Sequence, residues 1–306
     1  MKLLVAIALS AGLIFSSAFA PKLGKRGSGI SVVSTRDSVY FVSAPIVRFS
    51  QVQTPCVDVA IGDTSFVAEL DLGLRGDATL TRDLLDQIAD KSFVNKRSVY
   101  SWRGKKYIED VYKVPQMKIG GISFDHPKVQ AENKAFPEDA ILVKAGHERA
   151  PRELGRLGWK LFYHTNLFLD FKNSKIIFAD SIDTLKKHGY PMDMFVKTPL
   201  LLDRGLVEFE AVSINKPIRC VLDTGATWNI FHMETQKLVP ELVWDPKNTI
   251  EVRSFQIGGK DFGTLFAHSL PIHLPIKVEA IIGMEFLSDK SVFIDFRKKL
   301  LYFSSL

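Results

Sequence analysis

Asp223 is the residue whose type and position point most directly to chemistry, because it ends an apolar run of the chain. Residues 218–222 are rich in β-branched and aliphatic side chains, which predicts a buried strand. Asp223 then lies where the chain must reverse, and Gly225 supplies the backbone freedom of a tight turn. A carboxylate beside a core strand is costly to desolvate unless a partner or hydrogen bonds compensate. Taken alone, this Asp-Thr-Gly is also typical of a surface turn after a strand.

A second apolar segment, residues 280–284 with the sequence Ala-Ile-Ile-Gly-Met, changes the interpretation of Asp223. Asp-Thr-Gly-Ala, followed later by two aliphatic residues and a glycine, resembles the retropepsin-like aspartic proteases. The resemblance covers about residues 195–303. It implies that the later strand packs beneath the loop that carries a catalytic aspartate.

Aspartic proteases use two carboxylates, and an internal repeat indicates where the second one lies. Six motifs of the first half recur in the same order in the second half. The spacing from Gly158 to Asp170 equals the spacing from Gly283 to Asp295. The sequence therefore predicts a tandem duplication. The matched segments are 41–46 with 195–200, 69–73 with 221–225, 118–121 with 256–259, 156–159 with 281–284, 169–171 with 294–296, and 177–178 with 302–303.

The repeat places Asp71 opposite Asp223 as the expected catalytic pair. Many short strands and no regular alternation with long helices predict an all-β fold, and the repeat predicts two pseudo-symmetric lobes with a central cleft. The resemblance implies that these lobes are retropepsin-like. If the lobes pack about a pseudo-twofold axis, the two carboxylates meet and share one proton. The ionised one then acts as general base on a water, and the protonated one donates to the substrate carbonyl. The resemblance implies support of these loops by Gly73, Gly158, Thr224, Gly225, Ile281, Ile282 and Gly283.

A hairpin of the first half is expected to be the flap, which in the resembled family closes over the substrate. Residues 98–114 are predicted to form its two strands, with Gly104 at the tip. Tyr100, Trp102 and Tyr107 are candidates for substrate-facing aromatic residues. Simple packing of the hairpin is the alternative role for these three rings.

The start of the chain has the features of a secretory signal peptide. It has a charged beginning, a short apolar run and small residues at cleavage-site spacing. The run is short for a bilayer span, and an uncleaved anchor is the alternative. We therefore expect export to the periplasm or the extracellular space, without stable membrane insertion after cleavage. The expected order is signal peptide 1–20, flexible segment 21–40, first lobe 41–178 with an inserted surface loop mostly in 137–153, linker 179–194 and second lobe 195–306.

The first half departs from the family pattern at three positions. Leu72 replaces the usual Thr or Ser, whose hydroxyl in the family bonds across to the opposite loop. Leu74 replaces a small or hydroxyl residue, and Arg156 replaces an aliphatic residue beneath the loop. Such changes would loosen Asp71, move the pH optimum or abolish activity. The predicted function is an active aspartic endopeptidase, and the alternative is a protease-like fold that binds peptide or protein without cleaving it.

The composition favours a globular protein without nucleic-acid or metal chemistry. Hydrophobic residues make up 46% of the chain, charged residues 24%, and the net charge of +6 is spread out with no nucleic-acid-binding motif. No Gly-x-Ser-x-Gly and no His-Glu-x-x-His occurs, so we expect no metal and no cofactor. Of the two cysteines, Cys220 is expected to be a buried free thiol. The expected partner is a peptide or protein substrate, and the expected state is a monomer, with a dimer formed through the second halves as the alternative.

Overall fold

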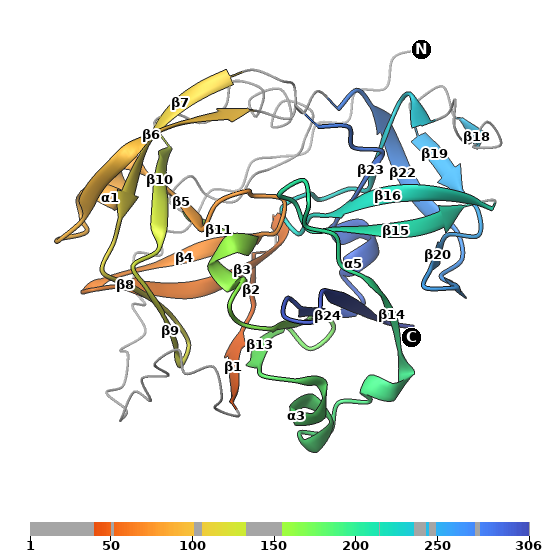
Figure 1. Ribbon diagram of the computed structural model, residues 1–306, viewed down its shortest axis with the longest axis horizontal. Coiled ribbons are helices and arrows are strands. Elements are labelled where there is room, and N and C mark those ends of the chain that lie inside the picture. The colour runs from red at the N-terminus through yellow and green to blue at the C-terminus, as the bar shows by residue number, and fades with distance from the viewer. Residues whose placement is uncertain are drawn as a thin grey trace, which may run out of the picture.

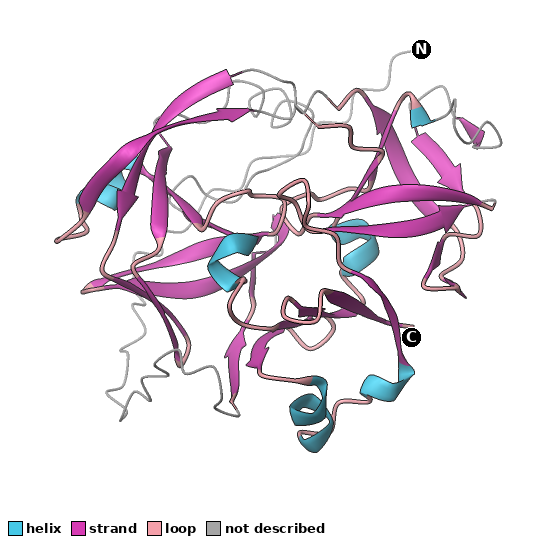
Figure 2. Ribbon diagram, in the orientation of Figure 1, coloured by secondary structure: helices cyan, strands magenta, loops and turns pink. Residues whose placement is uncertain are grey.

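The computed structural model describes residues 40–49, 52–100, 106–132, 155–213, 215–235, 243–244, 249–272 and 276–305. Within these ranges the chain forms three β-sheets with a few short helices, which confirms the all-β prediction (Figures 1 and 2). One sheet belongs to a first lobe, one to a second lobe, and a third joins them below in the view of Figure 1. The predicted signal peptide and the predicted insertion at 137–153 lie outside the described residues.

The first-lobe sheet has ten strands in the order β6-β7-β10-β5-β11-β4-β3-β8-β9, with β2 paired to β3. Helix α1 (Arg82–Asp86) follows β5 and buries Leu84 and Leu85 against the sheet, as their spacing predicts. The side chain of Thr81 caps this helix by accepting a hydrogen bond from the N–H of Leu84. The strands are β2 (Val47–Phe49), β3 (Val52–Ile61), β4 (Thr64–Asp71), β5 (Ala78–Thr81), β6 (Ser92–Tyr100), β7 (Lys106–Lys113), β8 (Gln116–Ile119), β9 (Ile122–Asp125), β10 (Lys128–Glu132) and β11 (Gly155–Gly158).

The second-lobe sheet has nine strands in the order β18-β19-β22-β17-β23-β16-β15-β20-β21. Its central strands are apolar and fully buried at the positions that face the core, as continuous aliphatic runs predict. The strands are β15 (Glu208–Ser213), β16 (Lys216–Leu222), β17 (Ile230–His232), β18 (Val243–Trp244), β19 (Thr249–Val252), β20 (Gln256–Ile257), β21 (Lys260–Asp261), β22 (Leu265–Leu270) and β23 (Ala280–Ile282), and helix α5 (Met284–Leu287) follows the last of them.

The central strands of the two lobes share one arrangement. In the first lobe, β11 runs parallel to β4 and antiparallel to β5, and β5 runs parallel to β10. In the second lobe, β23 runs parallel to β16 and antiparallel to β17, and β17 runs parallel to β22. Residues that occupy the same place in this shared arrangement are called equivalent below.

The third sheet takes strands from both halves of the chain, and β12 of the first half pairs with β24 of the second. Alternate residues face opposite sides, so that Phe178 and Ile294 enter the main core. Ile177 and Phe293 face the other side, where helix α3 (Ile182–Lys187) covers them. This helix lies in the segment predicted to be a linker. The strands are β1 (Phe41–Pro45), β12 (Leu167–Asp170), β13 (Lys175–Ala179), β14 (Phe195–Pro199), β24 (Ser291–Asp295) and β25 (Leu300–Ser304).

Candidate active site

Asp71 and Asp223 occupy equivalent turns at the ends of two buried strands. Asp71 is the last residue of β4, where it pairs with Gly158 of β11. Asp223 directly follows β16, and its backbone N–H donates a hydrogen bond to the carbonyl of Ile282 at 3.0 Å. In Figure 1 the two turns meet at the middle of the molecule, between the two lobe sheets. Strand burial therefore fixes where each carboxylate can lie.

The side chains of Asp71 and Asp223 are in direct contact across the lobe boundary. They are hydrogen-bonded to each other, and the N–H of Gly225 donates to Oδ1 of Asp223 at 2.9 Å. A Cβ added to Gly73 would lie 2.5 Å from Cγ of Asp223, and one added to Gly225 would lie 2.7 Å from Cγ of Asp71. Each turn therefore needs glycine because the carboxylate of the opposite lobe lies against it. The structure brings together the two carboxylates and the two glycines that the sequence predicted.

The carboxyl group of Asp223 keeps its proton to a much higher pH than an ordinary aspartate does. Burial and then the negative charge of Asp71 raise the pKa of Asp223 to about 8, and the charge of Glu69 adds to this effect. The hydrogen bond from the N–H of Gly225 opposes the shift without cancelling it. Asp223 therefore keeps its proton up to about pH 8 beside a second carboxyl group, and an acid next to a carboxylate is the arrangement that general acid–base catalysis requires.

Thr224 links the two turns through its side chain, which is fully buried. Its hydroxyl donates to the carbonyl of Leu70 at 2.5 Å and accepts from the N–H of Leu72 at 3.1 Å. Leu72 has no hydroxyl to return this contact, and its side chain is buried in the core instead. One half of the expected mutual brace is therefore present, and it holds the backbone on both sides of Asp71.

Gly158 and Gly283 lie beside the two turns at equivalent positions. A Cβ added to Gly158 would lie 2.2 Å from the carbonyl oxygen of Gly76, and one added to Gly283 would lie 2.4 Å from that of Trp228. The N–H of Gly283 donates to Oδ1 of Asn229 at 3.1 Å. Such close approaches exclude any side chain, so the resemblance assigned these two glycines to positions where only glycine fits. Ile281 and Ile282 precede Gly283 in β23 and are buried.

Arg156 introduces a cation beside Asp71. Its Nη1 lies 3.7 Å from Oδ2 of Asp71, and its Nη2 donates to Oε2 of Glu132 at 3.1 Å. All three side chains are largely buried, with at most 18% of their surface exposed. Burial opposes the charge of Arg156, but the carboxylates of Glu132, Asp71 and Glu69 raise its pKa. The guanidinium is therefore always charged, and it lies in the space where the equivalent residue of the second lobe is Ile281.

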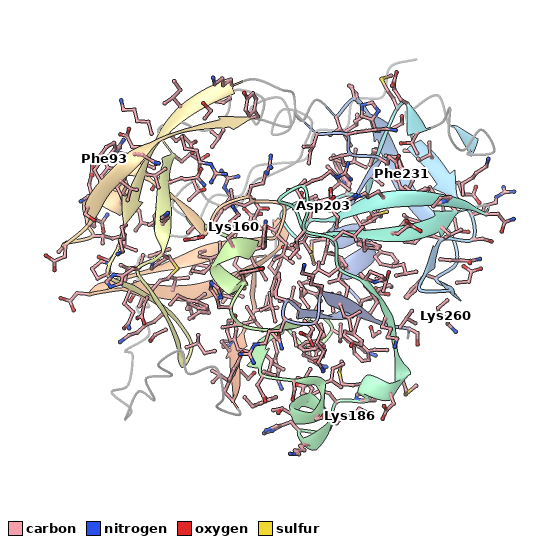
Figure 3. All side chains as sticks on the ribbon, in the orientation of Figure 1. Phe93, Lys160, Lys186, Asp203, Phe231 and Lys260 are labelled. Atoms are coloured by element: carbon pink, nitrogen blue, oxygen red, sulfur yellow. The ribbon has the colours of Figure 1, made fainter. Side chains whose placement is uncertain are left out.

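The predicted flap is a long hairpin of β6 and β7, in which Tyr100 pairs with Lys106 and Val99 pairs with Tyr107. The side chain of Tyr100 is exposed, whereas Trp102 and Gly104 lie outside the described residues. Phe93, on the same strand as Tyr100, is exposed at the outer side of the first lobe (Figure 3).

Glu109 is a buried carboxyl group of this hairpin that the sequence did not identify. Burial and then the charge of Glu132 raise the pKa of Glu109 to about 7, while the charges of Arg156 and Arg97 oppose the shift. The inner side of the hairpin therefore belongs to the same charged cluster as Asp71. Strand alternation alone does not distinguish this glutamate from its neighbour Asp110, because both are polar.

The lobes also contact each other beside the two turns. Nη2 of Arg75 donates to the carbonyl of Arg204 at 2.9 Å, and Nε1 of Trp159 donates to the carbonyl of Gly205 at 3.3 Å. Lys160 and Asp203 mark this junction near the centre of Figure 3. Leu74, the third departure from the family pattern, lies in the same turn as Arg75 and is half-buried.

The described part of the chain also contains both cysteines and most of the other residues that could carry chemistry. Cys56 and Cys220 are both buried and free, which confirms the free thiol expected at Cys220. Among the described residues, no three His, Cys, Asp or Glu side chains are grouped so that they could hold a metal ion. The described helices are all too short or too polar to cross a membrane.

The comparisons with known proteins agree with this geometry at the level of the fold. No protein-family model and no curated protein sequence matches the chain. Among solved structures, the chain is similar to the crystal structure of an aspartic proteinase from Irpex lacteus, with a TM-score of 0.54. The match covers 87% of this chain and 97% of the proteinase at 14% sequence identity. The protein therefore has an aspartic-proteinase-like fold.

Proposed function

We propose that this protein is an aspartic endopeptidase that uses Asp71 and Asp223 as a two-carboxylate pair. The observation that carries the proposal is the contact of these two side chains across equivalent turns, with the pKa of Asp223 raised to about 8 by burial and by the charge of Asp71. Such a pair has an acid and a base side by side, and it needs no metal or cofactor to hydrolyse a peptide bond.

In this mechanism the ionised Asp71 takes a proton from a water held between the carboxylates, and the oxygen of that water attacks the peptide carbonyl carbon. Asp223 donates its proton to the carbonyl oxygen, which yields a neutral tetrahedral intermediate. The intermediate then collapses with cleavage of the C–N bond: the leaving nitrogen takes the proton from Asp71, and one hydroxyl of the intermediate returns its proton to Asp223 as the new carboxylic acid forms. No covalent enzyme intermediate forms, and the N–H of Gly225 holds Asp223 in place throughout.

The hairpin of β6 and β7 is proposed to cover an extended peptide, which would pair like an added strand. Tyr100, Trp102 and Tyr107 are the proposed substrate contacts, and Gly104 is at the tip predicted from the sequence. We further propose that the chain arose by tandem duplication, acts as a monomer, and is exported to the periplasm or the extracellular space after removal of residues 1–20.

A protein that binds peptides in the same place without cleaving them is the second candidate. Leu72 and Arg156 favour it, because the first lobe lacks one bracing hydroxyl and has a cation beside Asp71. Against it, Thr224 still holds the backbone around Asp71, and both carboxylates are kept. We therefore place hydrolysis first.

The test is cleavage of an unfolded protein between pH 3 and pH 7 by the purified chain, with and without pepstatin. The expected result is pepstatin-sensitive cleavage that Asp223→Asn abolishes and Asp289→Asn, at an exposed aspartate, leaves intact. Binding of the same unfolded protein or of pepstatin without any cleavage would instead support the second candidate.

A further inference from the structure

We propose that Arg156 is a positioning residue that keeps the negative charge of the carboxylate pair on Asp71 and so leaves the proton on Asp223. The inference rests on the proposed function, because it assigns different roles to the two members of the same pair. Its physical basis is the contrast between what lies behind each turn.

Behind Asp71 lies a fixed cation. Nη1 of Arg156 is 3.7 Å from Oδ2 of Asp71, while Nη2 of the same planar group is held 3.1 Å from Glu132. Because the guanidinium is rigid, the contact with Glu132 directs the other nitrogen at Asp71. A positive charge at this distance in a largely buried site favours the ionised form of a carboxyl group.

Behind Asp223 lies an apolar cluster. Ile281, the equivalent of Arg156, packs with Leu206, Val221 and Val278, and all four are buried. Such surroundings disfavour a charge on the nearby carboxyl group. Burial is accordingly the largest cause of the raised pKa of Asp223. The charged side chains beside this apolar cluster are Glu208, which pairs with Val221, and its partners Arg204 and Arg219. The main causes of the raised pKa of Asp223 do not include these three charges. The two turns have the same backbone arrangement, so the contrast between Arg156 and Ile281 distinguishes their carboxyl groups.

The remaining charged groups around Arg156 do not remove this difference. Glu69 on β4 and Glu132 on β10 are negative and hold the guanidinium in place. Glu109 on β7 keeps its proton up to about pH 7, so it is neutral at acidic pH. Arg97 on β6 is opposite Glu109 in the hairpin and adds a second positive charge on that side.

Arg156 therefore affects the acid end of the pH range in which the enzyme is active. The pair works with one proton and one negative charge, and it is inactivated when Asp71 takes up a proton as the pH falls. By favouring the ionised form of Asp71, Arg156 extends the working range to lower pH. Loss of the cation should move this acid limit upward by about one to three pH units.

The test uses four variants of the full chain. Arg156→Met removes the cation and keeps an unbranched apolar side chain of similar reach to the arginine stem, and Arg156→Lys restores a cation. The double variant Glu132→Gln with Arg156→Gln replaces the ion pair by two neutral amides and leaves no unpaired charge between them, in case Arg156→Met does not fold. Arg219→Met is the matched control, because Arg219 is also held by two carboxylates, Glu208 and Asp203, but in the second lobe.

The measurements are the pH profile of kcat/KM and the carbon-13 NMR titration of the two side chains in protein labelled at the aspartate carboxyl carbons. Signals are assigned with Asp71→Asn and Asp223→Asn. In the wild type at pH 6, we expect an ionised Asp71 and a protonated Asp223. The acid limit and the Asp71 titration should rise by about one to three pH units in Arg156→Met. They should rise by less in the double variant, because the loss of the Glu132 charge opposes the loss of the nearer cation. They should return toward the wild type in Arg156→Lys and stay unchanged in Arg219→Met.

An unchanged Asp71 titration in a folded variant without the cation would overturn the inference, and so would an equal shift in Arg219→Met. The NMR titration does not need hydrolysis. A chain that shows the expected titrations but cleaves nothing would therefore retain the inference and reject the proposed function.

Discussion

The two lobes share one backbone arrangement, but the side chains packed beside the Asp71 turn differ in kind from those beside the Asp223 turn. Behind the Asp71 turn the equivalent positions are polar or charged, and behind the Asp223 turn they are aliphatic. In both lobes these side chains are buried or partly buried, but those beside Asp71 depend on mutual pairing of charges and those beside Asp223 on apolar packing. The equivalent pairs are Glu69 and Val221, Thr79 and Ile230, Glu132 and Leu270, and Arg156 and Ile281.

The shared strand pairing places the two carboxylates. The side chains packed beside each turn then decide how readily each carboxyl group ionises. The glycines that permit close approach are present in both lobes, and so are the parallel strand pairs. The lobes differ in the side chains packed beside the two turns. The following substitutions are therefore chosen to change either the positions of the two carboxylates or the charges around them.

The largest expected effect on stability is that of Arg156→Ala. Removal of one partner from a buried ion pair leaves Glu132 and Glu69 with uncompensated negative charge, so the variant should lose about 3–5 kcal/mol of unfolding free energy at pH 7. Urea unfolding measures this loss. The equivalent change, Ile281→Ala, should cost about 2–5 kcal/mol through a cavity. The two losses should differ in their dependence on pH, because only the first shrinks at pH 3, where carboxylates take up protons. Equal losses at both pH values for Arg156→Ala would contradict the claim that paired charges stabilise the region beside Asp71.

Gly73→Ala and Gly225→Ala should damage activity to a similar extent. Each added Cβ would lie within 2.7 Å of the carboxyl carbon of the opposite aspartate and would displace that side chain. A displacement of this kind costs about 10²-fold in kcat/KM. Gly121→Ala is the control, because within 4 Å its Cβ would meet only Cγ1 of Val42, at 3.2 Å and away from both carboxylates. Full activity in either turn variant would show that the carboxylates do not act from the positions described.

Glu109→Gln should flatten the dependence of stability on pH. The pKa of Glu109 is about 7 in the folded protein and has its ordinary value of 4.5 in the unfolded chain, so the wild type loses stability as the pH rises between these values. The loss is about 1–3 kcal/mol and should be absent from the variant, which thermal unfolding at pH 4.5 and pH 7.5 would measure. Glu210→Gln, at an exposed glutamate, should leave the wild-type slope. Asp223 adds a slope of the same sign in all three proteins. A Glu109→Gln slope equal to that of the wild type would remove Glu109 from the charged cluster.

Thr224→Val should lower the free energy of unfolding by about 1–3 kcal/mol. The change keeps the shape of the side chain but leaves the carbonyl of Leu70 and the N–H of Leu72 without their shared hydroxyl. Activity should also fall, because both groups flank Asp71. Thr235→Val removes one buried hydroxyl contact away from the turns and should lower stability only. If the two variants lost activity equally, the bridging role of Thr224 would be wrong.

The sequence was sufficient for the two turns because their signals are local. A strand that ends in Asp-x-Gly, found twice in repeat order, correctly placed Asp71 beside Asp223. The glycines at 158 and 283 followed from the same repeat. Leu72 was correctly singled out as a missing hydroxyl, but the sequence did not reveal that its backbone N–H still bonds to Thr224.

The cluster of charged side chains around Arg156 could not be predicted, because these residues lie on strands far apart in the sequence. Arg156 stood out as a departure, but its partners Glu132 and Glu109 come from β10 and β7, whose pairing depends on the whole sheet. Helix α3 was missed for another reason. The glycine and proline that follow it indicated a linker, although Ser181 is a regular N-cap and Leu185 a buried anchor.

The central claim, that each lobe supplies one carboxylate, is tested most directly by Asp71→Asn, with Asp223→Asn measured beside it. Hydrolysis and molecular mass in solution are recorded on the same samples. We predict that each variant loses activity by about 10²–10⁴-fold or more while the protein remains a monomer. Retention of activity by Asp71→Asn, together with a dimer mass and an inactive Asp223→Asn, would contradict the claim, because two second lobes would then be supplying the pair.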